Sequence, residues 1–408
     1  ANTPNYLDQG RSRYGSSFGI IADQAVTYSA PDGTKVTTGR HTKFAGPTDA
    51  FRGCGHPDPG HGWDQGRAER DYGFLAAASG NDSFALSCFN GNDLPVYKAL
   101  ARRFTVCDRW HASLLGPTYP NRLYLMSGQS GGHKTNYLPF AEDGYQWPAI
   151  FDRLDAAGVT VADYASDFPP FILFGSRATR FVRGIADFHA DAAAGTLPNV
   201  CFVDPSFLGD TENDDHPLAD PRAGQRFILD TFAAFQASPQ WQRGLFVVVY
   251  DEWGGFFDHV APPVVTDDRA SAVDANNFGQ LGFRVPAIIA SPLALPGFVD
   301  HAQYDHSSIL RFLEWRFLGA PPRGGGSKPG WYLTSRDQHA NNIGRSLSAK
   351  AFDPEPHFNV RMPLAAPSTA CAGSTGGFAP VIGTHPFNTA VDAGYLERVG
   401  ARLQHPHV

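Results

Sequence analysis

Basic residues are scarce in this chain of 408 residues, and long apolar runs are absent from its sequence. It has 33 Lys and Arg against 40 Asp and Glu, a formal net charge of -7, and no run of basic residues. A nucleic-acid-binding surface needs such a run or patch, so we predict that nucleic acid is not a partner. No apolar stretch approaches the roughly 20 residues that a membrane-spanning helix requires, so we predict no transmembrane segment.

Cysteine is also scarce, with five residues: Cys54, Cys88, Cys107, Cys201 and Cys371. None of them forms a C-x-x-C pair, which argues against a zinc ribbon and a redox motif. Cys107 and Cys201 fall in apolar strand patterns, where we expect buried free thiols. The odd count leaves at least one thiol unpaired within the chain, and one disulfide stays open as an alternative.

The sequence starts at Ala1 without the charged and then apolar pattern of a signal peptide. An initial Ala in place of Met indicates a trimmed or mature form, whose export signal would not be visible. The low Lys content and the 43 Gly and 32 Pro residues are typical of a loop-rich extracellular enzyme. We predict a secreted, periplasmic or cell-envelope protein and allow for transient contact with a membrane surface.

Strand-like and helix-like runs alternate from about residue 100 onward. The strand-like runs are 104–107, 160–164, 199–203, 245–250 and 285–290. The helical runs are 120–129, 150–157, 225–237 and 307–317. This alternation predicts an α/β fold with a doubly wound, mostly parallel sheet, helices on both faces and long active-site loops.

The two ends of the chain show little periodicity. Residues 1 to about 100 are Gly-rich, and we expect loops and short helices laid over the active-site face. From Pro321 the composition turns to Gly, Pro, Ser and Ala, and no convincing element follows residue 335. We predict a main domain at 1–330 and a loop-rich extension at 331–408 packed on it.

Carboxylates follow three of the predicted strands. Asp108, Asp204 and the Asp251-Glu252 pair stand at or just past the last apolar residue of a strand, and Gly254-Gly255 follows the pair at close range. Ligands bind at the carboxyl ends of strands in such sheets, where the glycines let the backbone approach closely. A strand-end Asp often caps the next loop, which stays an alternative for Asp108 and Asp204. Adjacent carboxylates repel unless a cation neutralises them, so we predict that Asp251 and Glu252 bind one divalent metal ion.

The segment Gly116–Arg122 places a hydroxyl, that of Thr118, just before the helix predicted from Pro120. A plain N-cap is the simpler interpretation. The alternative is a nucleophile, because the N–H groups and positive end of a helix stabilise both an alkoxide and the phosphate that it attacks. Asn121 and Arg122 lie in the first turn, where we expect them to donate to phosphoryl oxygens.

Two loops each hold a histidine beside acids: His61 in the segment 58–63 and His216 in the segment 213–217. Acidic neighbours favour the imidazolium form, which suits a group that donates to phosphoryl oxygens or protonates a leaving alkoxide. An isolated surface histidine without function is the alternative for either. His306 precedes the helix at 307–317 and is predicted to bind substrate at the same rim, although Ser307 as a simple N-cap of that helix explains much of the pattern.

Together these segments resemble the bacterial phospholipase C and acid phosphatase family, a branch of the alkaline-phosphatase-like superfamily. The resemblance spans about residues 50 to 320 and rests on Gly116–Arg122, Asn213–Pro217, Tyr250–His259 and Tyr304–His306, in the family's order, with Asp58–Trp63 as a weaker fifth segment. It implies that Thr118 is the nucleophile and contacts the metal, and that Asp251 and Glu252 ligate this metal. It also implies that His61 and His216 bind phosphoryl oxygens or assist the leaving group.

One family segment is not found in the sequence. Family members open with a strand that ends in Glu-Asn, followed shortly by Ser-Phe-Asp, and the Glu and Asn supply further metal ligands. We therefore expect a fragment without the first strand, with part of the metal shell missing and a gap in the sheet where a central strand belongs.

The resulting prediction is a metal-dependent phosphoesterase of phospholipase C type that forms a phosphothreonine on Thr118. An acid phosphatase that cleaves monoesters is the first alternative, and an inactive protein that binds phosphorylated head groups is the second. The aromatic residues Trp63, Trp253, Phe256 and Phe257 could cage a choline head group, although core packing explains most of them equally well.

Overall fold

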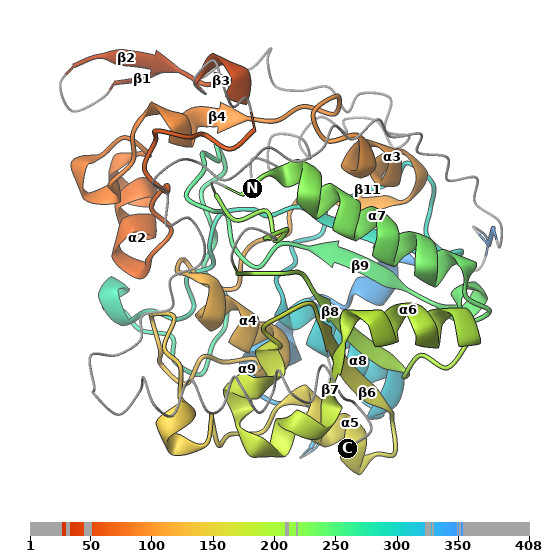
Figure 1. The fold of residues 1–408 in the computed structure, drawn as a ribbon. Coiled ribbons are helices and arrows are strands. Elements are labelled where there is room, and N and C mark those ends of the chain that lie inside the picture. The colour runs from red at the N-terminus through yellow and green to blue at the C-terminus, as the bar shows by residue number, and fades with distance from the viewer. Residues whose placement is uncertain are drawn as a thin grey trace.

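The computed structural model describes residues 27–29, 33–44, 51–208, 212–217, 219–322, 328, 330–348, 350 and 352–353. Two sheets lie at its centre (Figure 1). The four-stranded sheet has the order β11 (Val299–Asp300), β5 (Thr105–Cys107), β10 (Ala287–Ala290) and β9 (Phe246–Val249). The three-stranded sheet has the order β7 (Val182–Gly184), β6 (Val161–Ala165) and β8 (Val200–Asp204).

Most of these strands are parallel to their neighbours. β6 pairs in parallel with β7 and β8, and β11 pairs in parallel with β5. β10 is the exception, because it runs antiparallel to both β5 and β9. Two short ribbons lie apart from the centre: β1 (Thr27–Ser29) with β2 (Lys35–Thr37), and β3 (Gly39–Arg40) with β4 (Ser87–Cys88).

The α-helices of the described residues are α2 (Trp63–Tyr72), α3 (Pro95–Arg103), α4 (Thr118–Ser127), α5 (Ile150–Ala156), α6 (Ile185–Ala194), α7 (Pro221–Ala237), α8 (Ser307–Phe317) and α9 (Ser335–His339). Helices α3 and α7 share a hydrophobic cluster with β5, β9 and β10 of the four-stranded sheet. On the three-stranded sheet, α4, α5 and α8 pack with Val161 and Val200 on one face, and α6 packs with Ala162 and Tyr164 on the other. Helices thus cover both faces of the three-stranded sheet, and the predicted α/β class is confirmed.

The predicted elements from residue 100 to 317 are present, with shifts at their ends. The helix 307–317 has the predicted bounds, while α4 begins at Thr118, two residues before Pro120. The long helix α7 begins four residues before the predicted start, because Asp220 caps it by accepting from Arg222 N and Pro221 occupies its first turn. Before about residue 100, where loops and short helices were predicted, the structure has α2 of 10 residues and the start of α3, a helix of 9 residues.

The C-terminal extension was predicted without elements beyond residue 335, and α9 corrects this for its first part. Arg336 and Asp337 of α9 are buried against the main body. Residues 354–408 lie outside the described residues.

The cysteines divide into two groups. Cys54 is disulfide-bonded, and Cys88, Cys107 and Cys201 carry free thiols. Cys107 is buried as predicted, whereas Cys201 is only half-buried. Within the described part of the chain, no helix is both long enough and apolar enough to cross a membrane.

Candidate active site

Arg122, in the second turn of α4, brings the carboxyl ends of β8 and β9 together. Its Nη1 lies 2.5 Å from Asp204 Oδ1, and its Nε lies 2.8 Å from Asp251 Oδ2. Two of the three predicted strand-end acids therefore converge. The third, Asp108, instead forms an ion pair with the exposed His301, at 2.6 Å.

A cavity of about 750 Å³ opens beside this rim. Six of the eight residues predicted as catalytic, substrate-binding or metal-binding line it: Thr118, Arg122, His216, Asp251, Glu252 and His306. The fold thus gathers side chains from positions nearly 190 residues apart around one space.

The Thr118 hydroxyl does not cap the helix that it begins. Pro117 is the N-cap of α4, and no side chain caps it. Thr118 is 6% exposed, and the described residues offer its hydroxyl no hydrogen-bond partner. The N-cap interpretation is therefore wrong, and the hydroxyl stays available at the positive end of a helix.

Asn121 holds the turn that presents Thr118. Its Oδ1 accepts from Leu114 N at 2.7 Å, and its Nδ2 donates to Gly116 O at 2.8 Å and to Pro117 O at 3.1 Å. The residue is completely buried. Because both of its N–H groups are engaged by carbonyls, Asn121 acts in this structure as a positioning residue.

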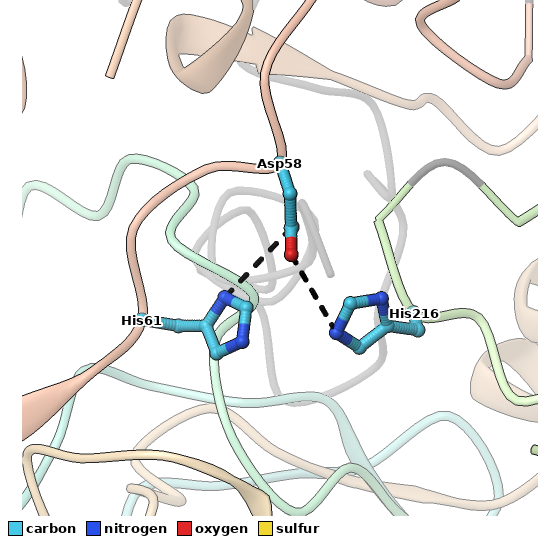
Figure 2. Close-up of side chains that lie close together, drawn as sticks. All are labelled: Asp58, His61 and His216. Atoms are coloured by element: carbon cyan, nitrogen blue, oxygen red, sulfur yellow. Dashed lines mark ion pairs between the residues drawn. The ribbon is translucent and has the colours of Figure 1, made fainter. Parts of the chain in front are cut away.

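Asp58, His61 and His216 form a second group of side chains, shown in Figure 2. Asp58 lies 3.9 Å from His61 Nδ1 and 4.0 Å from His216 Nε2. The two imidazole rings meet edge to face, with centroids 5.3 Å apart. Among the described residues, this is the only set of three His, Cys, Asp or Glu whose ligand atoms all lie within 4.8 Å of one another.

The two histidines have different electrostatic surroundings. Burial opposes the charged form of both, but Glu252, Asp58 and Asp251 together raise the pKa of His61 above its usual value. Burial dominates for His216 and lowers its pKa, with the nearby His61 adding to this effect. His61 therefore favours the protonated imidazolium form, and the neighbouring His216 favours the neutral form.

Hydrogen bonds fix both side chains of the Asp251-Glu252 pair and the main chain of Asp251. Asp251 Oδ1 accepts from Glu252 N at 3.0 Å, and Glu252 Oε2 accepts from Gly254 N at 2.7 Å. His306 Nε2 donates to Asp251 O at 2.7 Å, while its Nδ1 accepts from Trp110 Nε1 at 3.3 Å. Burial lowers the pKa of His306, which favours this neutral form. His306 therefore positions the main chain of Asp251.

Comparison with known proteins identifies the family. Residues 14–318 match the Phosphoesterase family. The chain belongs to the Phosphoesterase family. It is 36% identical over 317 residues to Non-specific phospholipase C4 of Arabidopsis thaliana, covering 71% of this chain and 57% of that protein. It is 31% identical over 311 residues to Non-hemolytic phospholipase C of Pseudomonas aeruginosa, covering 64% of this chain and 43% of that protein.

This Phosphoesterase-family chain therefore spans about half the length of the curated relatives that it matches. Phospholipase C B of Mycobacterium tuberculosis is a further relative, 33% identical over 288 residues, 59% of this chain and 54% of that protein. Among solved structures, a protein in the alkaline phosphatase superfamily from Vibrio parahaemolyticus aligns with a TM-score of 0.33 and 12% identity, over 54% of this chain and 59% of that one.

The carboxylate and imidazole groups in the site of this family member are suitable ligands for a divalent cation. Burial raises the pKa of the Glu252 carboxyl, and the adjacent charge of Asp251 raises it further against the opposing effect of His61. A cation would relieve this repulsion between buried carboxylates. Carboxylate oxygens suit hard cations, while the two imidazoles of the Asp58 group suit zinc and similar metals.

The close approach of two loops depends on a glycine that the sequence singled out. Gly255 has a φ of 70°, and a Cβ there would lie 2.5 Å from the carbonyl carbon of Pro59. This contact brings the Asp58–His61 loop against the loop that carries Glu252. From the sequence, Asp58 was only an acidic neighbour of His61. Its contact with His216 could not be predicted, because the two residues lie far apart in the chain.

The aromatic residues suggested as a choline cage belong to the core instead. Trp253 is fully buried, Phe256 and Phe257 are each 4% exposed, and Trp63 is 6% exposed. Trp253 Nε1 donates to the buried Glu69 at 2.8 Å. These four side chains form the packing behind the site.

Proposed function

We propose that this protein is a metal-dependent phosphoesterase of phospholipase C type that cleaves the phosphodiester of phospholipids through a phosphothreonine on Thr118. The observation that carries the proposal is the hydroxyl of Thr118, unpartnered at the start of α4, on the same cavity as Asp251, Glu252 and His216. Family membership supports the reaction class, and the names of the relatives support a phospholipid substrate over a simple monoester.

Two displacements at phosphorus complete the reaction. First, Thr118 Oγ1 releases its proton to solvent and bonds to phosphorus, the bond from phosphorus to the oxygen of the lipid alcohol breaks, and His61 or His216 gives that oxygen a proton. Then water attacks phosphorus, the bond to Oγ1 breaks, and one proton of the water passes to Oγ1. The phosphorylated head group leaves with the hydroxyl of Thr118 restored, and the histidine takes up a proton from solvent. We propose Asp251, Glu252 and Thr118 as ligands of one ion, which would lower the hydroxyl pKa and stabilise charge on a phosphoryl oxygen. Arg122 keeps Asp251 in place for this role.

Replacing the nucleophile tests the proposal. Thr118→Val keeps the shape of the side chain without its hydroxyl, and we expect turnover of p-nitrophenylphosphorylcholine to fall by roughly 10³-fold or more. Thr118→Ser should keep measurable activity, and acid-quenched wild-type protein should carry phosphate on residue 118. Thr105→Ser on β5 is a matched control at another buried threonine, away from the cavity. Turnover by Thr118→Val at the wild-type rate would remove Thr118 from the mechanism.

A comparison of substrates separates the proposal from its alternatives. A phospholipase should prefer p-nitrophenylphosphorylcholine to p-nitrophenyl phosphate, whereas an acid phosphatase should show the reverse. Binding of phosphorylcholine without turnover of either compound, in metal-loaded protein, would favour the inactive binding protein.

We also propose that the protein acts in the cell envelope or outside the cell, in transient contact with a membrane surface. The disulfide at Cys54 supports this, because disulfides persist mainly in oxidising compartments. Fractionation of the source cells tests it, and a pool confined to the cytosol would contradict it.

A further inference from the structure

Glu69, a buried carboxyl group in α2, contacts the loop that carries Glu252. It is 2% exposed, and each of its oxygens accepts a hydrogen bond. Its Oε2 accepts from Trp253 Nε1 at 2.8 Å, and its Oε1 accepts from Asn81 Nδ2 at 2.7 Å. Trp253 directly follows Glu252 and packs closely on α2, since a Cβ at Gly66 would lie 2.8 Å from the indole. Glu69 therefore fixes the side chain next to a proposed metal ligand.

The second partner of Glu69 leads to the loop of His61. Asn81 Oδ1 accepts from Gly60 N at 2.6 Å. The carbonyl oxygen of the same peptide group, Pro59 O, lies 2.7 Å from His61 Nδ1. A carbonyl oxygen only accepts, so His61 Nδ1 carries a proton and donates to it, which leaves Nε2 to exchange a proton with a substrate. One peptide group thus contacts Asn81 on one side and His61 on the other, and its orientation sets that of the imidazole.

We call the hydrogen bonds from Trp253 to Glu69, from Asn81 to Glu69 and from Gly60 to Asn81 the Glu69 network. Its two ends determine its direction, because an indole Nε1–H and a main-chain N–H only donate. Asn81 must therefore turn its oxygen toward Gly60, and Glu69 must accept at both oxygens. Burial raises the pKa of Glu69 against the effect of its two donors, and each oxygen keeps a lone pair for accepting in either protonation state. A glutamine would present its NH₂ group to one of the donors.

We propose that Glu69 is a positioning residue, which fixes His61 and Glu252 relative to each other through the Glu69 network. Glu69 is not among the residues that line the cavity, so it acts through these two side chains. They come from distant segments and serve the same phosphoryl group, one as a proton or hydrogen-bond donor and the other as a metal ligand. The loss of such outer hydrogen bonds typically lowers activity by about 10- to 100-fold. This inference rests on the proposed function.

A pair of exchanged side chains tests the network. Glu69→Gln keeps the size of the side chain but turns an amide toward a donor, and Asn81→Asp alone sets two carboxyl groups against each other. In the double variant the new aspartate accepts from Gly60 N and from the new glutamine, whose oxygen accepts from Trp253 Nε1. All three hydrogen bonds are then restored in a different arrangement.

Turnover of a short-chain phosphatidylcholine is the first measurement. We expect each single variant to lower kcat by about tenfold with KM changed by less than about twofold, and the double variant to regain kcat to within about threefold of wild type. Glu314→Gln is the matched control, the same change at another fully buried glutamate outside the cavity lining, and it should keep the wild-type kcat.

The protonation of His61 in metal-free protein is the second measurement and needs no turnover. Long-range ¹H–¹⁵N spectra of histidine-labelled protein show which ring nitrogen carries the proton, and His61→Gln identifies the His61 signals. Neutral His61 should hold its proton on Nδ1 in wild type, shift toward a mixture of both tautomers in Glu69→Gln, and return to Nδ1 in the double variant. These shifts in a protein without turnover would contradict the proposed function and still support the positioning role of Glu69.

Other outcomes would overturn the positioning role. A wild-type kcat or an unchanged His61 spectrum in Glu69→Gln would do so, as would a double variant in which the two single losses multiply. If a single variant fails to fold, the double variant decides. Recovery of folding and of the His61 signals in the double variant supports the network, and a double variant that stays unfolded overturns it.

Discussion

Arg122 shows how a single residue can organise this site. Its guanidinium is bound by Asp204 and Asp251, and although burial lowers its pKa, these carboxylates raise it overall, so the group stays charged. Its positive charge thereby offsets the negative charges of two carboxylates that stand at the ends of strands from different sheets. From the sequence we predicted that Arg122 contacts phosphate. Its ion pairs with Asp204 and Asp251 could not be predicted, because these acids belong to two other segments of the chain.

At the same scale, Gly255 should be the least replaceable glycine near the site. Gly255→Ala would place a methyl group 2.5 Å from main-chain atoms of Pro59, at a φ of 70°. Gly158→Ala is a matched control with a φ of 73° and nothing within 4 Å of its Cβ. We expect Gly158→Ala to cost about 1–2 kcal/mol of unfolding free energy and Gly255→Ala clearly more, with loss of activity. Urea unfolding of both variants checks this, and equal costs would contradict the crowding at Gly255.

At the scale of elements, a buried carboxyl couples α8 to its neighbours. Glu314 of α8 is fully buried, lies 3.4 Å from Arg153 of α5 and accepts from Leu333 N before α9. Burial and the carboxylate of Asp337 outweigh Arg153 and raise the pKa of Glu314 to about 10. The packing of these helices therefore depends on a carboxyl group that keeps its proton at neutral pH.

The resulting pH dependence can be measured. The folded pKa of Glu314 is raised above its unfolded value, so the folded state holds more protons between these values. Its stabilising contribution is complete below its ordinary pKa of 4.5 and is lost as pH rises from there through the folded pKa of about 10, with a slope of at most about 1.4 kcal/mol per pH unit. Glu314→Gln, which stays neutral, should weaken the fall in unfolding free energy between pH 6 and pH 9. Identical pH profiles for the two proteins in urea unfolding would show that Glu314 is ionised in the fold.

At the scale of the whole molecule, metal binding should stabilise the fold as well as support turnover. An ion present at 100 times its dissociation constant adds about 2.7 kcal/mol to the unfolding free energy by mass action. We expect divalent cations, tested one at a time as Mg²⁺, Ca²⁺, Mn²⁺ and Zn²⁺, to raise the melting temperature of chelator-treated protein. Glu252→Gln should lose this shift, because it removes a proposed ligand.

Asp58→Asn provides the matched comparison for that experiment. It removes the carboxylate of the Asp58–His61–His216 group, and we expect it to keep most of the metal-dependent shift. The reverse result, with Asp58→Asn losing the shift and Glu252→Gln keeping it, would move the ion to the histidine group. No shift with any of the four ions would contradict a stabilising metal site.

The division into a main domain at 1–330 and an extension at 331–408 stays a prediction. The burial of Arg336 and Asp337 against the main body is in keeping with an extension that packs on the core. Limited proteolysis near residue 330 would test whether the main domain stands without it.

The sequence by itself determined the strands, most helices and the family. A run such as Phe246–Val249 consists only of aromatic and β-branched apolar residues, and its local preference for a strand agrees with its place in the sheet. The Thr118 and Asp251-Glu252 motifs could be found for a similar reason, because each is contained in a few consecutive residues.

Only the tertiary structure decided the features that join distant segments. Helix α2 has a mostly polar sequence without a clear apolar stripe, and it is held by buried polar contacts, such as the bond from Arg67 to Leu115 O at 3.1 Å. The Asp58–His216 contact, the ion pairs of Arg122 and the cavity beside them likewise depend on packing between residues far apart in the chain. Local propensity carries no information about such contacts, since their free energy appears only when the segments meet.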